Sequence, residues 1–126
     1  MVEFIIVAPF LFMLIFGIIQ FGVLFHDYLA LTDSVRVGAR QAAVSRLLPD
    51  PADAAKSRLE QAADPSLDLS KDLQISVTPY DPATNTATFA QNGNVTVSAS
   101  YPYSINLLGF VVKLGRMTSE TTERVE

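Results

Sequence analysis

An uninterrupted apolar segment near the start of the chain limits what the protein can fold into. Residues Phe4 to Phe25 contain no charged side chain, and Gln20 is their one polar side chain. As a helix this segment is about 33 Å long, enough to cross the hydrocarbon core of a bilayer. Its many Val, Leu, Ile, Met and Phe side chains would each cost roughly 1.5 kcal/mol or more if left in water. The segment is therefore expected in lipid or inside an assembly.

A cleaved secretory signal is the alternative explanation for an apolar segment at this position. Such signals begin with basic residues, have a shorter apolar region and end in a small-residue cleavage site. Here Glu3 precedes the segment and no Ala-x-Ala sequence follows it. These features favour a membrane-spanning helix over a signal peptide.

The helical pattern continues beyond the apolar segment, which predicts one long helix that leaves the membrane near His26 and ends at Leu48. In this continuation an apolar face lies opposite a charged face that includes Asp33, Arg36 and Arg40. Small side chains also recur at every fourth position, and such a ridge lets another element approach the backbone closely. We expect this ridge to pack against a sheet; its members are Ala30, Ser34, Gly38 and Ala42.

The rest of the chain predicts a small head of mixed structure. Pro49 disfavours helical geometry in the residue before it, and Asp50 followed by Pro51 predicts the cap of a short second helix that ends at residues 64–66. Apolar and polar residues alternate from Asp72 onward, which predicts a half-buried strand. The Asn92-Gly93 pair predicts a tight hairpin between residues 86–90 and 94–101.

Two further segments complete the predicted head. Residues Ile105 to Leu114 are mostly apolar but too short to cross a membrane. We expect a buried loop or short helix under the sheet there, or else a subunit-contact patch. The Thr-rich residues 116–126 predict a final strand antiparallel to residues 94–101.

The predicted fold class is therefore α+β, with a long N-terminal helix packed on a small antiparallel sheet. Residues 1–25 form the membrane-spanning or filament-core half of the helix, and residues 26–48 form its amphipathic half. Residues 49–126 form the globular head. This head carries ten acidic side chains against six basic ones, and the whole chain has a formal net charge of −4.

Composition argues against several classes of function. An acidic head repels the phosphates that dominate nucleic-acid affinity, so we expect no nucleic-acid partner. The chain has no cysteine and one histidine, His26, and its carboxylates are scattered singly. Because catalysis needs convergent acid, base or nucleophile groups in a pocket, we expect no enzyme, cofactor or metal site.

Several short elements are spaced along residues 2–44: Val2-Glu3-Phe4, Pro9, the stretch from Gly17 to Gly22, and the stretch from Val35 to Arg40. In these elements the chain resembles the TadE-like (TadE/TadF) pilins of the tight-adherence, or Flp, systems, which are relatives of the type IVb pilins. A weaker similarity continues at residues 95–103. Such pilins have a glutamate at the fifth position after prepilin-peptidase cleavage, behind a basic leader that ends in Gly. Here the glutamate is third.

The resemblance implies a structural pilin subunit that polymerises through its N-terminal helix into an extracellular type IV filament of the Tad/Flp kind, for adhesion. Its implied partners are identical subunits in a helical homopolymer, the prepilin peptidase and the Tad assembly machinery. It implies a single-pass precursor in the inner membrane and then a place in the extracellular pilus. The alternative is a minor pseudopilin that stays in the inner membrane as an assembly or priming factor.

Four sets of residues are the candidates for this assembly role. Glu3 is expected to pair with the free α-amine of a neighbouring subunit and so to set the axial register, although a carboxylate at a helix N-terminus is also favoured by the helix dipole alone. Pro9, Gly17 and Gly22 are expected to let the helix bend. The small-residue ridge described above is the third set. Arg36 and Arg40 either contact an acidic patch on a neighbouring head or are simply solvated.

Overall fold

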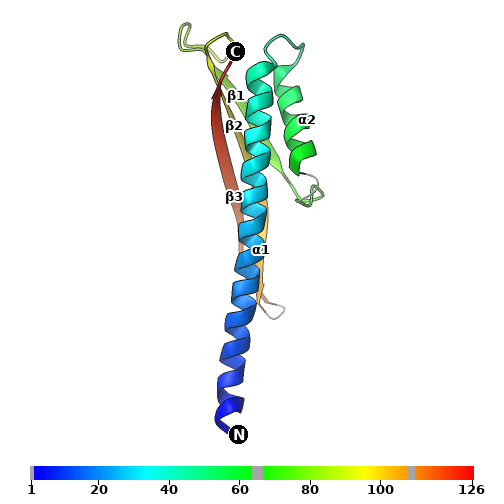
Figure 1. Ribbon diagram of the computed structural model, residues 1–126, viewed down its shortest axis with the longest axis vertical. Coiled ribbons are helices and arrows are strands. Elements are labelled where there is room, and N and C mark those ends of the chain that lie inside the picture. The colour runs from blue at the N-terminus through cyan, green and yellow to red at the C-terminus, as the bar shows by residue number, and fades with distance from the viewer. Residues whose placement is uncertain (1, 64–66, 108–109) are drawn as a thin grey trace.

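A computed structural model describes residues 2–63, 67–107 and 110–126 (Figure 1). Helix α1 spans Val2–Val44 and helix α2 spans Pro51–Ala63. Strands β1, β2 and β3 span Gln74–Tyr80, Asn94–Leu107 and Phe110–Arg124. Figure 1 shows that α1 is the long axis of the molecule: the sheet and α2 lie beside its C-terminal half, and its N-terminal part projects beyond them. The predicted α+β class is confirmed.

Helix α1 runs through the apolar and amphipathic halves without interruption, as predicted, but it ends at Val44 rather than at Leu48. Ser45 explains the earlier end. Its hydroxyl donates to the Gln41 carbonyl, and its N–H donates to the Ala42 carbonyl at 3.3 Å, which tightens the last turn. The chain then turns, with the Leu48 N–H donating to the Ser45 carbonyl at 2.9 Å.

Helix α2 begins as its sequence predicts. The N–H of Asp53 donates to Oδ1 of Asp50 at 3.1 Å, so Asp50 is the N-cap and Pro51 is the first helical residue. Ala55, Leu59 and Ala63 are the buried positions of this helix. Its predicted end at residues 64–66 lies outside the described part of the chain.

The sheet is antiparallel throughout, with β2 between β1 and β3. Strand β1 alternates between exposed and half-buried positions along its whole length, which confirms the predicted strand after Asp72. Strand β3 contains the Thr-rich residues and pairs with β2, with Val97 opposite Thr121, as predicted for the final strand.

The predicted hairpin at Asn92-Gly93 is wrong, because β2 pairs with β1 and not with residues 86–90. The Asp81 carboxylate ends β1: it accepts from the N–H of Ala83 at 2.9 Å and from Thr84 Oγ1 at 2.6 Å, which closes a turn. Asn92 does adopt the left-handed conformation typical of a turn, with a φ of 66°. Asn85, in the loop after β1, is also left-handed, with a φ of 53°. However, the Asn92 N–H donates to the Val125 carbonyl at 2.9 Å, so the turn residue fixes the segment after β3 instead of joining two strands.

The prediction of a buried loop or short helix at Ile105 to Leu114 is also wrong for the described residues, which extend β2 and β3 into a long hairpin. The ladder continues past the Tyr103–Gly115 pair, with a bulge between Ile105 and Asn106. A Cβ on Gly115 would lie 2.8 Å from the Tyr103 ring. Glycine therefore lets the tyrosine lie across the opposite strand, and the pairing is not broken.

The core of the head lies between the C-terminal half of α1, the sheet and α2. α1 contributes small and medium side chains, and the largest fully buried ones elsewhere are Tyr101 and Leu59. The Tyr101 hydroxyl donates to the Asp68 carbonyl at 3.4 Å. The other members of the core are Leu31, Val35, Ala39, Ala42, Ala43, Ala55, Ala63, Leu67, Val95, Val97, Ala99, Met117 and Val125.

Candidate assembly surface

The N-terminal half of α1 presents its apolar side chains to the outside. Phe4 and Phe10 are each 72% exposed, and every large apolar residue from Val2 to Phe21 is exposed. An 18-residue window of this helix has a mean hydropathy of 2.7, and none of it is buried within the protein. The helix is thus long and apolar enough to cross a membrane, and this part of it does not contribute to the core of the head.

Glu3 lies in the first turn of α1, where its carboxylate is close to the positive end of the helix dipole. The side chain is exposed, and no ion pair is formed with it among the described residues. Its position at the far end of the projecting helix separates it from the charges of the head (Figure 1). Any charged partner within the described chain would have to reach across the whole apolar half.

Pro9, Gly17 and Gly22 lie within the unbroken helix. A Cβ added at either glycine would meet no atom within 4 Å. Glycine inside a helix is less favourable than alanine by about 1 kcal/mol, and packing inside this chain does not require it at these two positions.

The small-residue ridge of α1 faces the head. Ser34 and Ala42 are buried and Ala30 is half-buried; the Ser34 hydroxyl is satisfied by donating to the Leu31 carbonyl at 2.8 Å. At Gly38 the neighbouring element is α2 rather than the sheet. A Cβ there would lie 3.0 Å from Leu59 Cβ.

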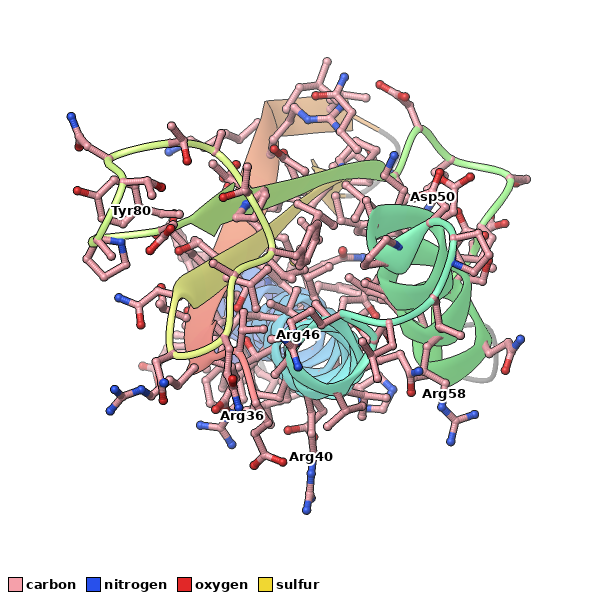
Figure 2. All side chains as sticks on the ribbon, turned by 90° about the horizontal axis from the view of Figure 1, so that it is seen from above. Arg36, Arg40, Arg46, Asp50, Arg58 and Tyr80 are labelled. Carbon is pink, nitrogen blue, oxygen red and sulfur yellow. The ribbon has the colours of Figure 1, made fainter. Side chains whose placement is uncertain are left out.

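Arg36 and Arg40 point away from the head, on the outer side of α1 (Figure 2). Arg36 Nη1 lies 4.0 Å from Asp33 Oδ1, and both side chains are more than two-thirds exposed, at 69% and 77%. An exposed pair of this kind contributes little to stability. Arg40 borders a groove that is also lined by Glu123, Arg124 and Glu126. Both arginines are thus surface charges.

A groove lies between α1 and the β2–β3 hairpin, and no sequence pattern predicts it. This groove has a volume of about 310 Å³, and it is lined by Phe21, Leu24, Phe25, Tyr28, Tyr103, Arg116 and Met117. A second, smaller groove is also lined by Tyr103 and includes Gln20 and Ser104. The hairpin therefore lies beside the helix at the level where the apolar half meets the amphipathic half.

Arg116 forms hydrogen bonds to two other segments near this groove, and no sequence pattern predicts this role. Its Nη1 donates to Asp72 Oδ2 at 3.1 Å, and its Nη2 donates to the Asp72 carbonyl at 2.7 Å. Nη2 and Nε also donate to the carbonyl and Oγ of Ser100, each at 2.9 Å. One guanidinium thus joins β3 to β2 and to the segment before β1.

Two carboxylates of the head, those of Asp81 and Asp68, accept hydrogen bonds within local turns. Hydrogen bonds from the Thr84 hydroxyl and the Ala83 N–H lower the pKa of Asp81. Hydrogen bonds from the Ser70 hydroxyl and N–H do the same to the pKa of Asp68. Within the described ranges no three His, Asp or Glu side chains come together as metal ligands.

The comparisons with known proteins agree with the sequence elements. A family model described as TadE-like protein matches residues 1–40, which confirms the predicted resemblance over the apolar half and the start of the amphipathic half. No curated protein and no solved structure matches the chain significantly. The match suggests a protein associated with Tad pili.

Proposed function

From a chain whose first 40 residues are TadE-like, we propose a structural pilin subunit of a Tad/Flp-type filament that serves adhesion. The precursor is inserted in the inner membrane through the apolar half of α1, is processed by the prepilin peptidase and is then stacked by the Tad assembly machinery. In the filament the same apolar half packs against identical copies.

The exposed apolar half of α1 is the observation that carries this proposal. The head covers α1 mainly from about Leu24 onward, and the large apolar side chains before Leu24 are exposed. At roughly 1.5 kcal/mol or more for each large apolar side chain, this surface needs either lipid or neighbouring helices. A subunit that moves from membrane to filament exchanges one cover for the other.

Glu3 supplies the axial register in this proposal. When helices bundle, a carboxylate at this position enters apolar surroundings, where an unpaired charge is strongly unfavourable. The α-amine of a neighbouring subunit is a cation of the right size, and pairing with it fixes how far one helix is displaced along the next.

The residues expected to bend α1 are compatible with such packing. Pro9 removes one backbone hydrogen bond, and the surroundings of Gly17 and Gly22 are open. Glycine positions of this kind allow neighbouring helices to approach closely. We propose that α1 bends or is approached at these positions in the filament, with Arg36 and Arg40 on the outer side available to acidic residues of an adjacent head.

The alternative is a minor pseudopilin that primes assembly from the inner membrane. The same helix serves both roles, so the two are separated by where the protein is found and in what amount. Shearing cells that express the chain should release it as fibres, and imaging these fibres should trace residues 1–44 in their core. Recovery only from the membrane fraction, with fibres built from another subunit, would favour the alternative.

A further inference from the structure

We propose that the end of the β2–β3 hairpin enters the membrane–water interface beside α1 and so sets how deeply the subunit sits in the bilayer. The hairpin end is defined here as residues 104–107 and 110–114. The inference rests on the membrane-bound stage of the proposed function, and it adds a second membrane contact that is formed by a sheet.

The position of the hairpin end follows from the contacts of Tyr103. This residue borders both grooves together with Leu24 of α1. Four residues of β2 beyond Tyr103 extend about 13 Å, which corresponds to about nine residues of helix. Figure 1 shows this part of the hairpin running alongside α1 toward its N-terminus. The hairpin end therefore overlaps in height with the last turns of the apolar segment.

The exposed side chains of β3 change from polar to apolar toward the hairpin end, as expected for a strand that approaches the membrane. Toward the far end of the head its exposed residues are polar, as at Thr118, Glu120 and Thr122. At the hairpin end Val111 is 58% exposed and Leu114 is 72% exposed. Lys113 is the only charged residue in the hairpin end, and a lysine stem can pass along apolar surface while its ammonium reaches the headgroups.

Gln20 provides an independent observation. It is the one polar side chain in the apolar segment, it is half-buried, and it borders the groove formed with Tyr103 and Ser104. The hairpin thus lies over the side of α1 that carries Gln20, where a polar side chain would be least favourable in contact with lipid. Tyr28, Tyr103 and Arg116 lie at the same level, and aromatic and basic residues are enriched where a protein crosses the membrane surface.

The backbone limits how deep the hairpin goes. β1 pairs with β2 only as far as Ser100, so in the described residues the hairpin end is a two-stranded ribbon with open edges. Open edges are not tolerated in the hydrocarbon core, but in the headgroup region water and lipid can satisfy them. Interfacial segments reach about 5–10 Å into the headgroup and acyl boundary. The hairpin end is therefore a depth stop for α1 and not a second spanning element.

Lipid is the occupant that the observations favour over a second copy of the chain. The hairpin end is continuous with, and level with, the segment that needs lipid, whereas the polar part of β3 farther from the membrane needs no cover. A neighbouring subunit could cover the hairpin end only after assembly, when it replaces lipid. The experiment below therefore distinguishes lipid from a second copy.

The absence of cysteine from the sequence permits a direct test with single spin labels. The full chain is placed in phosphatidylcholine–phosphatidylglycerol vesicles with one label at L114C, V111C, T118C or F12C. Thr118 is the matched control, since it is exposed on the same face of β3 four residues away. Collision with oxygen, which concentrates in lipid, is compared with collision with a water-soluble nickel chelate.

The expected result is a ratio of oxygen to nickel collisions that is severalfold higher at L114C and V111C than at T118C, and highest at F12C. Equal ratios at L114C and T118C, with F12C in lipid, would overturn the inference and leave the membrane stage intact. A water-exposed F12C would overturn the membrane stage itself. A low nickel collision rate at L114C that rises when the protein is diluted into excess lipid would show that a second copy covers this surface. That result would also overturn the inference.

A charge substitution tests the depth stop without relying on the label at the hairpin end. L114E and T118E are compared, with the label at F21C in both. Neither position contributes to the core. We expect L114E, and not T118E, to move the F21C label toward water, as a lower ratio of oxygen to nickel collisions. An unchanged ratio in L114E would show that the hairpin does not control the depth of α1.

Discussion

The two halves of α1 share one secondary structure but have opposite surroundings. The half within the head buries mostly small side chains, such as Ala39 and Ala42, and it accommodates α2 at Gly38. The projecting half carries Phe, Leu, Ile and Met, and it buries none of them. Along α1, large apolar side chains are thus exposed on the projecting half, whereas the half within the head buries Leu31 and otherwise mostly small side chains that let its neighbours approach. The predictions below test this division.

The largest effect is expected at the one charge in the projecting half. Changing Glu3→Gln removes one member of the proposed buried pair, and breaking such a pair costs about 3–5 kcal/mol. Filament yield in the sheared fraction should fall strongly, while the amount inserted in the membrane stays the same. Asp33→Asn, on the exposed side of the other half, is the control. Normal filaments from Glu3→Gln would remove the register role.

The next effect separates the two halves by stability. Leu59 is fully buried in the head, whereas Leu14 is 59% exposed on the projecting half. Leu59→Ala should lower the free energy of unfolding of the head by about 2–5 kcal/mol, and Leu14→Ala should leave it unchanged. Chemical unfolding in detergent, followed by circular dichroism, measures both. Equal losses would mean that the projecting half also packs on the head.

A smaller effect distinguishes the glycines of the two halves. Gly38→Ala forces Leu59 and the backbone of α2 to move, because the added Cβ would lie 3.0 Å from Leu59 Cβ and 3.3 Å from the Ala55 carbonyl oxygen. Overpacking of this kind costs about 1–3 kcal/mol, measured as the unfolding of the head. Gly22→Ala meets no atom and should not lower that stability. A defect of Gly22→Ala confined to filament assembly would support close packing between subunits.

Arg36 and Arg40 are expected to contribute least to the stability of the subunit. Their replacement by Gln should change the free energy of unfolding by less than about 1 kcal/mol, because exposed pairs are weak. A salt-dependent loss of filament stability in the double variant, absent in wild type, would identify a contact between subunits. Filaments with unchanged salt dependence would show that both side chains are simply solvated.

The pH dependence of the loop after β1 is the smallest effect. Because hydrogen bonds lower the pKa of Asp81 in the folded state, its contribution is present above the ordinary aspartate range and is lost as the pH falls through the folded pKa. Asp81→Asn keeps an acceptor for the Ala83 N–H but does not titrate, so the unfolding free energy of this variant should depend less on acid pH. Identical pH profiles would exclude a role for this carboxylate.

Local signals were sufficient to predict much of the fold. The apolar segment, the Asp50 cap and the alternation in β1 each depend on neighbouring residues in the sequence, and each was confirmed. The pairing of β1 with β2 was not predicted, because Asn92-Gly93 is the stronger hairpin signal in the sequence. The turn that ends β1 instead forms at Asp81, through side-chain hydrogen bonds. The loop or short helix predicted at residues 105–107 and 110–114 is wrong because apolar composition was equated with burial, whereas Val111 and Leu114 are exposed.

The candidate surface divides in the same way. Glu3, Pro9 and the two glycines of the projecting half were identified from sequence, and their roles between subunits stay predictions. The ridge on α1 was identified as a packing face, but the sequence did not reveal that α2 would occupy it at Gly38. Arg116 was not identified at all, since its contacts depend on the register that places it next to Ser100 and Asp72.

The alignment of the hairpin with α1 has a mechanical consequence. Strands β2 and β3 run beside the helix (Figure 1), and Val125 and Glu126 attach the end of this sheet to α1 through the core and through the Glu126 N–H to the Ala43 carbonyl at 3.1 Å. A pull along the helix axis therefore loads the strands lengthwise, across ladder bonds that lie perpendicular to the force. These bonds resist the sliding of one strand past the other all at once and are not opened one after another, so the head would resist tension along the axis of the proposed filament.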